Sequence, residues 1–413
     1  MTRKLNDPEL DRLVQELNRP TPPGESAQEG APAPLSTPAA EELDLPGRSR
    51  VEEGEPLDGL LLELARQQAS DLLLIAGLPP VFRVDGRLLK AQAESLDGDE
   101  LAQMFKPHLG SRTRRHLEER GSTDFSLRLA PGRELDEGGG GRRFRVNLHR
   151  QRGQLAAAIR ALPLEVPPLA ALNLPPAFAE LVKPSRGLVL LCGPTGSGKT
   201  TTLAALVGEI NRGRSAHIIT IEDPVEYEHR SIKSIVEHIE IGRDARSFPE
   251  ALRAALRQDP DVILVGEMRD LETVATALTA AESGHLILST LHTNDAAQSV
   301  HRIVDVFPPN QQAQIRHQLA LSLHAIVVQQ LVPRADGRGR VPAIELLAAT
   351  YPVRNHIRSD NLQKLYNEII LGKRAGMMSM EESLGQLALQ GIISPEEAQV
   401  RASHPDELAS HLR

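Results

Sequence analysis

The sequence predicts an α/β fold, preceded by a smaller α+β unit and followed by a helical segment. The first observation is a set of apolar runs at 187–192, 217–221, 262–265 and 286–288, which are typical of buried parallel strands. The second is that the earliest run leads directly into a glycine-rich loop and then into a helix start. The third is that residues 56–160 instead show short strands of alternating character behind one amphipathic helix.

Composition places the chain among soluble globular proteins and limits its partners. A length of 413 residues suggests two or three domains, and 2% aromatic residues require aliphatic cores. The net charge of −8 argues against nucleic acid as a partner, because such binding needs a basic surface. The single cysteine, Cys192, excludes a four-cysteine zinc site. With no signal-peptide pattern and no apolar run of about 18 residues, we expect a cytoplasmic protein.

The organisation of the chain follows from shifts in composition. Residues 1–55 hold eight of the 30 prolines and twelve acidic against six basic residues, which is typical of a disordered tail. Within this tail, residues 7–17 predict a transient helix, and the alternative is a docking helix for a partner. The expected divisions are the acidic tail 1–55, an α+β domain at 56–162, a proline-punctuated linker at 163–176, the α/β domain at 177–345 and a helical bundle at 346–413.

Local patterns fill in the first and last of these domains. A helix is predicted at 57–64, because its leucines recur on one face. A flexible hairpin tip is expected at 131–141, and Ser394 followed by proline predicts the start of a terminal helix. The strands predicted in the α+β domain are 71–75, 80–88, 123–129, 143–150 and 156–160.

The segment 193–200 has the spacing of a phosphate-binding loop and lies between an apolar strand and a helix start, as such a loop requires. Its glycines let the backbone wrap a phosphate, and the helix amino terminus adds a favourable dipole. We expect Lys199 to reach the β- and γ-phosphates of ATP, and the Thr200 hydroxyl to ligate Mg²⁺. The residues predicted to bind nucleotide are Gly193, Pro194, Thr195, Gly196, Ser197, Gly198, Lys199, Thr200 and Thr201. The alternative, a glycine-rich turn without a ligand, is disfavoured by the flanking strand and helix.

Three further strands end in side chains that suit ATP hydrolysis. Glu226 follows the first, Glu267 the second and His292 the third, which His285 precedes. Because the carboxyl ends of parallel strands share one edge of the sheet, where α/β ligand sites form, we expect a common site. The second strand resembles a Walker B strand, but Gly266 stands where a metal-binding Asp is usual. Glu267 is therefore the candidate to polarise the attacking water, or to hold it near Mg²⁺.

Each of these residues also has a structural interpretation. An acid at a strand end is often a solvated cap, and a histidine near a strand is often a hydrogen-bonded core or surface residue. Arg253 and Arg257 could stabilise transition-state charge, in their own subunit or in a neighbour, or simply pair with Glu250 or Asp261. Their joint occurrence, in order behind an intact phosphate loop, favours the functional interpretation.

Together these motifs resemble those of the secretion ATPase superfamily. The matching segments are the Walker A motif at 193–202, the Asp box at 221–226, the Walker B motif at 265–273 and the His box at 284–293. The likeness is greatest to the pilus retraction ATPases of the PilT and PilU type. It extends to 69–86, which is similar to the start of that family's amino-terminal domain, and to 353–358, which looks like its carboxy-terminal motif.

The resemblance implies a RecA-like P-loop domain, preceded by a PAS-like domain at about 58–160, in a homo-hexameric ring. It implies that ATP turnover with Mg²⁺ drives pilus retraction and twitching motility. The implied partners are an inner-membrane pilus platform protein and a paralogous motor ATPase, with the chain cytoplasmic and peripheral at the inner membrane. The family's catalytic Glu falls on Glu267, its Asp box acid on Glu226, and its box histidines on His285 and His292.

Departures from the family bear on the subunit interface. The family often has an arginine after its Asp box, where this chain reads Val-Glu-His-Ile-Glu, and Arg243 is the candidate to compensate. The other candidates for interface arginines are Arg253, Arg257 and Arg269.

Three functions remain open from the sequence. In the carboxy-terminal motif, which is tied to retraction rather than hydrolysis, His356 and Ser359 stand where Leu and Glu are usual. The leading hypothesis is a retraction motor. The second is an assembly-type secretion or pilus-extension ATPase, which usually carries a four-cysteine metal element that one cysteine cannot form. The third is an accessory ring subunit that hydrolyses little, against which the intact Lys199 and Glu267 argue.

Overall fold

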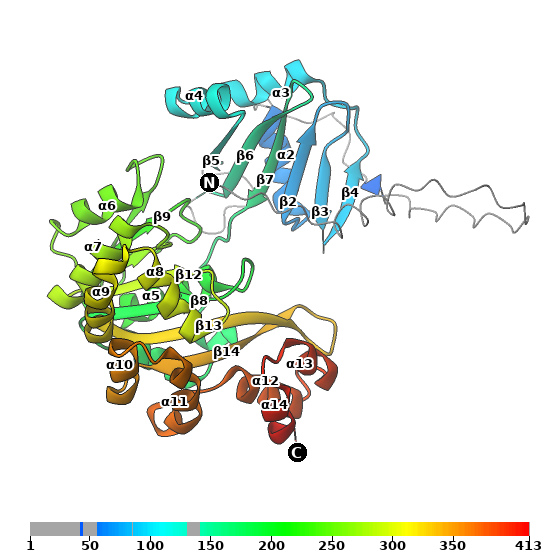
Figure 1. Ribbon diagram of the computed structural model, residues 1–413. Helices are drawn as coiled ribbons and strands as arrows, with labels where there is room; N and C mark the ends of the chain where they lie inside the picture. Colours follow the sequence, from blue (N-terminus) through cyan, green and yellow to red (C-terminus); the bar gives the residue numbers. More distant parts are fainter. Residues whose placement is uncertain (1–41, 44–55, 85, 130–140, 413) are drawn as a thin grey trace, which may run out of the picture. The chain divides into compact units, whose positions relative to one another are not determined.

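The described part of the chain contains two separate β-sheets, each of seven strands (Figure 1). The computed structural model describes residues 42–43, 56–84, 86–129 and 141–412. The expected acidic tail, with its helix at 7–17, lies outside these residues except for the pair 42–43. Most of the expected hairpin tip at 131–141 lies outside them as well.

The first sheet is antiparallel apart from one short parallel pair at its edge, where β1 joins β4. Its strand order is β1-β4-β3-β2-β7-β6-β5. The strands are β1 (Glu42–Leu43), β2 (Asp71–Ile75), β3 (Val81–Val84), β4 (Arg87–Ala91), β5 (Ser122–Arg128), β6 (Arg143–Gln151) and β7 (Gln154–Ala161). Each strand predicted for this region is confirmed, including the turn between β3 and β4, where Gly86 has a φ of 82°.

Helices cover one face of this first sheet, because alternate strand residues are apolar. Phe144, Val146 and Ile159 are fully buried there, together with Leu57 and Leu61 of the predicted first helix. The helical elements are α2 (Pro56–Arg66), α3 (Gly98–Phe105), the 3-10 turn η2 (Lys106–His108) and α4 (Ser111–Arg120).

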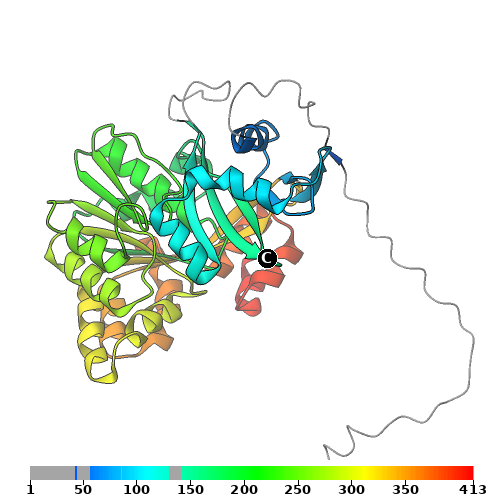
Figure 2. The ribbon, with the colours of Figure 1, turned by 90° about the horizontal axis from the view of Figure 1, so that it is seen from above.

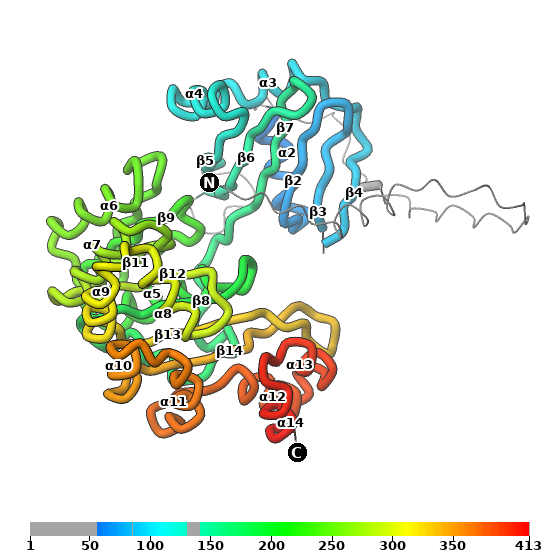
Figure 3. The backbone as a smooth tube through the Cα atoms, in the orientation of Figure 1, coloured from blue at the N-terminus to red at the C-terminus, as the bar shows by residue number. Residues whose placement is uncertain are grey.

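The second sheet is parallel except for its last strand and has the order β10-β9-β11-β12-β8-β13-β14. The strands are β8 (Gly187–Cys192), β9 (His217–Glu222), β10 (Ile235–Glu240), β11 (Val262–Val265), β12 (Leu286–Leu291), β13 (Leu323–Pro333) and β14 (Arg340–Ala348). The four apolar runs of the sequence are the four central strands β9, β11, β12 and β8. Neither β10 nor the long antiparallel pair β13–β14, traced in Figure 3, was predicted.

Helices flank both faces of the second sheet, as its doubly buried strands require. Helix α5 packs on one face with two 3-10 segments, and α6 to α9 pack on the other. Figure 2 shows the yellow helices α8 and α9 beside the orange α10, and α9 packs against α10. The bounds are η3 (Leu169–Leu172), η4 (Pro176–Val182), α5 (Lys199–Gly213), α6 (Phe248–Ala255), α7 (Leu271–Ser283), α8 (Ala296–Asp305) and α9 (Pro309–Ser322).

The carboxy-terminal helices begin later than expected, because β14 continues past residue 345 to Ala348. They are α10 (Tyr351–Arg358), the 3-10 turn η5 (Leu362–Lys364), α11 (Leu365–Leu371), the 3-10 turn η6 (Gly372–Ala375), α12 (Met380–Leu389), α13 (Pro395–Arg401) and α14 (Pro405–His411). The predicted start at Ser394 is confirmed, since its side chain accepts a hydrogen bond from the Glu397 N–H at 3.2 Å. None of the helices in the described ranges is both long and apolar enough to cross a membrane.

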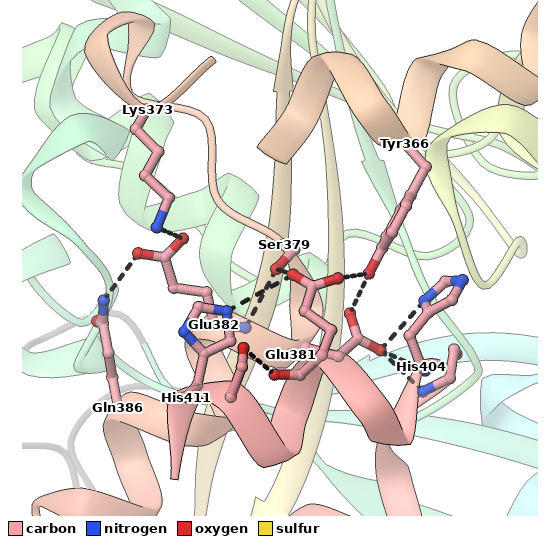
Figure 4. A network of polar contacts seen from close by, with 11 residues as sticks. Tyr366, Lys373, Ser379, Glu381, Glu382, Gln386, His404 and His411 are labelled. Carbon is pink, nitrogen blue, oxygen red and sulfur yellow. Dashed lines mark hydrogen bonds and ion pairs between the residues drawn. The ribbon is translucent and has the colours of Figure 1, made fainter. Parts of the chain in front are cut away.

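A polar network joins α11, α12 and α14 (Figure 4). Glu381, only 1% exposed, accepts hydrogen bonds from the backbone N–H groups of Ser403 at 2.9 Å and His404 at 2.8 Å. The Tyr366 hydroxyl, with one hydrogen to donate, lies between two carboxylates, 3.1 Å from Glu381 and in contact with Glu407. Because a buried carboxylate is costly unless it is hydrogen-bonded, this network specifies how these helices pack.

Candidate nucleotide-binding site

The predicted phosphate loop lies at the carboxyl end of β8 and leads directly into α5. Gly193, Gly196 and Gly198 have φ values of 139°, 78° and 87°, a backbone conformation that residues with a Cβ rarely adopt. Gly198 is the residue before the first turn of α5, whose free N–H groups and dipole favour an anion. Strand, loop and helix therefore form an anion-binding cradle.

Lys199 is held inside this loop by the loop's own backbone. Its ammonium group donates to the carbonyl oxygens of Gly193 at 2.7 Å and Pro194 at 2.9 Å. The side chain is 7% exposed, and burial lowers its pKa. The Ser197 hydroxyl nearby is buried and has no hydrogen-bond partner among the described residues. A buried cation beside an unpartnered hydroxyl fits a bound phosphate group, which would accept hydrogen bonds from both.

Glu267 follows β11, and the phosphate loop follows β8. Both lie at the same edge of the parallel sheet, where only β12 separates these two strands. Its carboxylate is 2.7 Å from the Arg269 guanidinium and 4.0 Å from Nε2 of His292. Burial raises the pKa of Glu267, Arg269 lowers it, and the nearby Asp223 raises it. Lys199 lowers the pKa of Glu267, and both residues follow parallel strands at the same edge of the sheet. A carboxylate with a raised pKa is suited to accept a proton near neutral pH.

Gly266, the departure from the usual Walker B pattern, has a packing reason. Its N–H donates to the carbonyl oxygen of Ile221 at 2.8 Å, and a Cβ added there would lie 3.3 Å from the same oxygen. The Thr290 hydroxyl donates to the Gly266 carbonyl at 2.5 Å. Strands β9 and β12 thus hold the residue before Glu267 from both sides, and a larger residue would need them to shift.

The Asp box segment after β9 is held through its backbone. Arg143 of β6 donates to the carbonyl oxygens of Val225 at 2.7 Å and Glu226 at 2.8 Å. The Tyr227 hydroxyl and the Thr201 hydroxyl at the start of α5 are 3.0 Å apart. Glu226 therefore lies next to residues that contact the first turn of α5. Neither Arg143 nor Tyr227 was predicted, because both contacts join segments far apart in the sequence.

Glu222, the last residue of β9, is a buried acid with an altered pKa. Its residue exposure is 8%, and burial raises its pKa to about 7, with the nearby Glu226 also raising it. A hydrogen bond from Thr220 opposes this shift of the pKa. The charge of Glu226 thus adds to burial in disfavouring the ionised form of Glu222.

His292 and His285 lie at opposite ends of β12. His292 follows the strand at the phosphate-loop edge, and its pKa is lowered by burial, by Lys199 and by Arg269. His285 precedes the strand, where its carbonyl accepts from the Gly187 N–H at the start of β8. A strand of this length separates the two histidines by about 20 Å. The structure does not bring His285 to the phosphate loop of its own chain, contrary to the expectation of one site.

The arginine candidates are also separated. Arg269 contacts Glu267, whereas Arg253 forms an ion pair with Glu272 of α7 rather than with Glu250 or Asp261. Arg257 lies beyond the end of α6 at Ala255, so it does not share a helix face with Arg253 as predicted. Arg243 is 3.9 Å from Asp244 and 72% exposed. Among these four, Arg269 is the one with a contact to a predicted catalytic residue.

Comparison with known proteins shows the family to which the chain belongs. The model of the family described as Type II/IV secretion system protein matches residues 169–394, and the chain belongs to that family. The fold and the phosphate loop define it as a P-loop ATPase. It is 43% identical over 347 residues to the "Type IV pilus retractation ATPase PilT" of Pseudomonas aeruginosa, covering 84% of this chain and 98% of that protein.

Two further relatives extend the comparison. The "Type IV pilus ATPase PilU" of Pseudomonas aeruginosa is 37% identical, with 84% of this chain and 89% of that protein covered. The solved structure titled "Crystal Structure of the Pilus Retraction Motor PilT and Bound ADP" superposes with a TM-score of 0.77 at 44% identity. It covers 87% of this chain and 100% of the solved one. The resemblance to the PilT type is therefore confirmed, as is the predicted fold class.

Proposed function

We propose that this chain is a subunit of a hexameric ATPase ring that retracts a type IV pilus. The observation that carries the proposal is that Glu267 and the phosphate loop follow parallel strands at the same edge of one sheet, in a chain similar to PilT over 98% of that protein's length. ADP in the solved PilT structure supports nucleotide binding at the same loop. The chain therefore has both the site of an ATPase and the extent of a retraction motor.

The residues of the site divide the work of hydrolysis. The N–H groups of the loop 193–200 hold the phosphates, and Lys199 leaves its carbonyl partners to contact them. Glu267 orients the attacking water and accepts its proton. His292, with a lowered pKa, is neutral at neutral pH and lies next to the same carboxylate. Glu226 completes the acidic edge of the site.

The donor set also fits Mg²⁺, although the described residues contain no group of three or more His, Cys, Asp or Glu side chains that could hold a metal ion. The Thr200 hydroxyl lies in the first turn of α5, and Glu267 would hold the ion through a water molecule, since Gly266 supplies no carboxylate. Bound Mg²⁺ neutralises charge that develops on the phosphate oxygens. This chain contributes the Thr200 hydroxyl as an oxygen ligand at the end of the phosphate loop.

A ring is proposed because, among the four candidate arginines in the part of the chain that the structure describes, Arg253 and Arg269 already form ion pairs within their own chain. Arg253 is paired with Glu272 and Arg269 with Glu267, so a neighbouring subunit would supply the missing positive charge. The exposed Arg243 is the candidate arginine that this chain would contribute to the site of a neighbouring subunit. The similarity to both PilT and PilU supports a ring that is homo-hexameric or shared with a paralogue.

The remaining proposals concern organisation and location. We propose the division into tail, PAS-like domain, linker, RecA-like domain and helical bundle at residues 1–55, 56–162, 163–176, 177–345 and 346–413. The two sheets support the separation of the two larger domains. The partner is an inner-membrane pilus platform protein, which would hold a cytoplasmic ring at the membrane surface.

A genetic replacement tests the direction of the motor. In the host cell, the native gene is exchanged for one that encodes Glu267→Gln, and surface pili and twitching are scored. The retraction motor predicts cells that keep their pili but no longer twitch. Cells without pili would instead identify an assembly motor. Cells that twitch normally would contradict any essential motor role and would favour the accessory subunit.

A further inference from the structure

A glutamine of strand β13 lies directly beneath the phosphate loop. Strand β13 runs beside β8 until Val328 pairs with Cys192, where β8 ends and the loop begins. The next residue of β13, Gln329, is only 2% exposed, and its backbone carbonyl is the closest neighbour that a Cβ on Gly193 would meet. Strand β13 therefore forms the floor of the loop.

Both ends of the Gln329 side chain are bound by the loop and the helix that follows it. The amide Nε2 donates to the carbonyl oxygen of Ser197 at 2.7 Å, and Oε1 accepts from the Thr202 hydroxyl at 2.9 Å. Because a carbonyl oxygen can only accept, the nitrogen end of the amide must face Ser197. The partners are separated from Gln329 by more than 120 residues of sequence (|i−j| of 132 and 127), so no local pattern indicates the contact.

The bond to Ser197 fixes the direction of the following N–H group. In a trans peptide the C=O and the N–H point to opposite sides of one plane. With the Ser197 carbonyl held against β13, the Gly198 N–H is turned away from β13. The same contact explains a glycine at 198, since a Cβ there would lie 2.8 Å from Nε2 of Gln329.

We propose that Gln329 is a positioning residue of the phosphate loop, holding the Ser197–Gly198 peptide so that its N–H is available to the β-phosphate of ADP or ATP. Thr202 anchors the other end of the amide to the first turn of α5. The inference rests on the proposed ATPase function and adds a residue outside the predicted loop. Without the anchor, the peptide can rotate, and the affinity for diphosphate falls in proportion to the population that keeps the binding orientation.

The experiment compares Gln329→Met with Gln330→Met in the full chain. Methionine is nearly as long as glutamine. Its side chain cannot donate a hydrogen bond to the Ser197 carbonyl, and it lacks the amide oxygen that accepts from the Thr202 hydroxyl. Gln330 is the adjacent residue of β13 and is partly exposed, and because successive strand residues point to opposite faces, it controls for the change in the strand. Binding of ADP and of AMP is measured by calorimetry, and thermal unfolding reports whether each variant is folded.

For Gln329→Met the expected result is an ADP affinity about tenfold lower or more, with AMP affinity changed less than about twofold, because AMP lacks a β-phosphate. Gln330→Met should bind both ligands like the native chain. Gln329→Glu serves as a second variant if the first does not fold, since it keeps the acceptor for Thr202 and loses the donor to Ser197. It should show the same selective loss of ADP.

Two results would overturn the inference alone. The first is ADP binding by a folded Gln329 variant that equals the binding of Gln330→Met. The second is an equal loss of AMP and ADP affinity, which would indicate general damage to the pocket. A native chain that binds no ADP at all would instead contradict the proposed function itself.

Discussion

Glu267 is held between two opposing influences on its charge. Burial favours the protonated carboxyl and raises its pKa, while the Arg269 guanidinium at 2.7 Å favours the carboxylate and lowers it. The balance matters because only the carboxylate can accept a proton from the attacking water. The ion pair with Arg269 therefore belongs to the site, because it favours the form of Glu267 that can accept a proton.

Replacing Arg269 by glutamine should move the acid limb of the pH–rate profile to higher pH. As the pH falls through the pKa of Glu267, the carboxylate is lost and turnover declines; without Arg269 that pKa rises, so the decline begins at a higher pH. The measurement is kcat against pH, with the exposed Arg340→Gln as a control of equal charge. An acid limb that stays in place, or moves to lower pH, would show that Arg269 does not tune Glu267.

At the scale of elements, the close approach of β13 to the phosphate loop restricts which loop positions can carry a side chain. A Cβ at Gly193 would lie 2.2 Å from the carbonyl oxygen of Gln329, whereas one at Gly196 meets no atom within 4 Å. Both positions have positive φ, so a side chain costs backbone strain at each. The two positions differ in the approach of β13 and also in backbone strain, since φ is 139° at Gly193 and 78° at Gly196.

Gly193→Ala should therefore abolish measurable ADP binding and lower the unfolding temperature, because either the loop or β13 must shift. Gly196→Ala should cost only the strain of its left-handed backbone, about 1–2 kcal/mol of stability. Calorimetric unfolding and ADP titration of both variants provide the comparison. If the two substitutions proved equally harmful, the close approach of β13 would not be the cause.

Two carboxylates accept hydrogen bonds from backbone N–H groups at the start of α8, the helix that follows His292. The Asp295 side chain accepts from the Gln298 N–H at 2.7 Å, and the Glu345 side chain accepts from the Ala296 N–H at 2.9 Å. Glu345 lies on β14, is 5% exposed, and burial raises its pKa to about 7. This acid links the start of α8 to the strand against which α12 packs.

Substituting Glu345 by glutamine should stabilise the protein above neutral pH. Its pKa is about 7 in the folded chain against an ordinary 4.5, so the folded state binds more protons between these values and stability falls as the pH rises through that window. Glutamine keeps the acceptor oxygen without the charge, so the free energy of unfolding should rise by about 1–3 kcal/mol at pH 8. At about pH 4 the two chains should differ little.

Denaturant unfolding at the two pH values measures this difference, with the exposed Glu250→Gln of α6 as the control. A Glu345→Gln chain that is less stable than the native one at pH 8 would mean that the charged form is the better cap. The proposed titration would then be wrong.

At the scale of the whole molecule, the strands and the loop that local sequence patterns encode could be predicted. The apolar runs predicted the four central strands, and the spacing of 193–200 predicted the loop between β8 and α5. Glu267 was found because it ends one of those strands. The edges of the second sheet were missed: β10 is too polar to resemble the central strands, and β13–β14 carries the buried polar residues Gln329 and Glu345.

The misplaced residues share a physical cause. His285 and His292 were both assigned to catalysis from the resemblance to the family's His box, yet they lie at opposite ends of one strand, about 20 Å apart. Arg253 finds its partner on another helix, and Gln329 finds both of its partners in a loop far away in sequence. In each case the determining contact depends on how elements pack, which periodicity does not reveal.

The proposed dependence of catalysis on assembly also belongs to the scale of the whole molecule. Among the arginine candidates of the described residues, those near the acidic edge or its helices are already paired in their own chain. The proposed ring would let a neighbouring subunit supply transition-state charge, so under that proposal turnover should depend on assembly.

Steady-state ATP hydrolysis by the full chain, at a concentration where the mass of the ring is observed, tests the central claim most directly. The native chain should turn over ATP, and Glu267→Gln should lower kcat by about 100-fold or more while ADP binding is retained. Lys199→Ala should lose ADP binding as well. A native ring that hydrolyses ATP no faster than the Glu267→Gln ring would contradict the claim that this site is an ATP-driven motor.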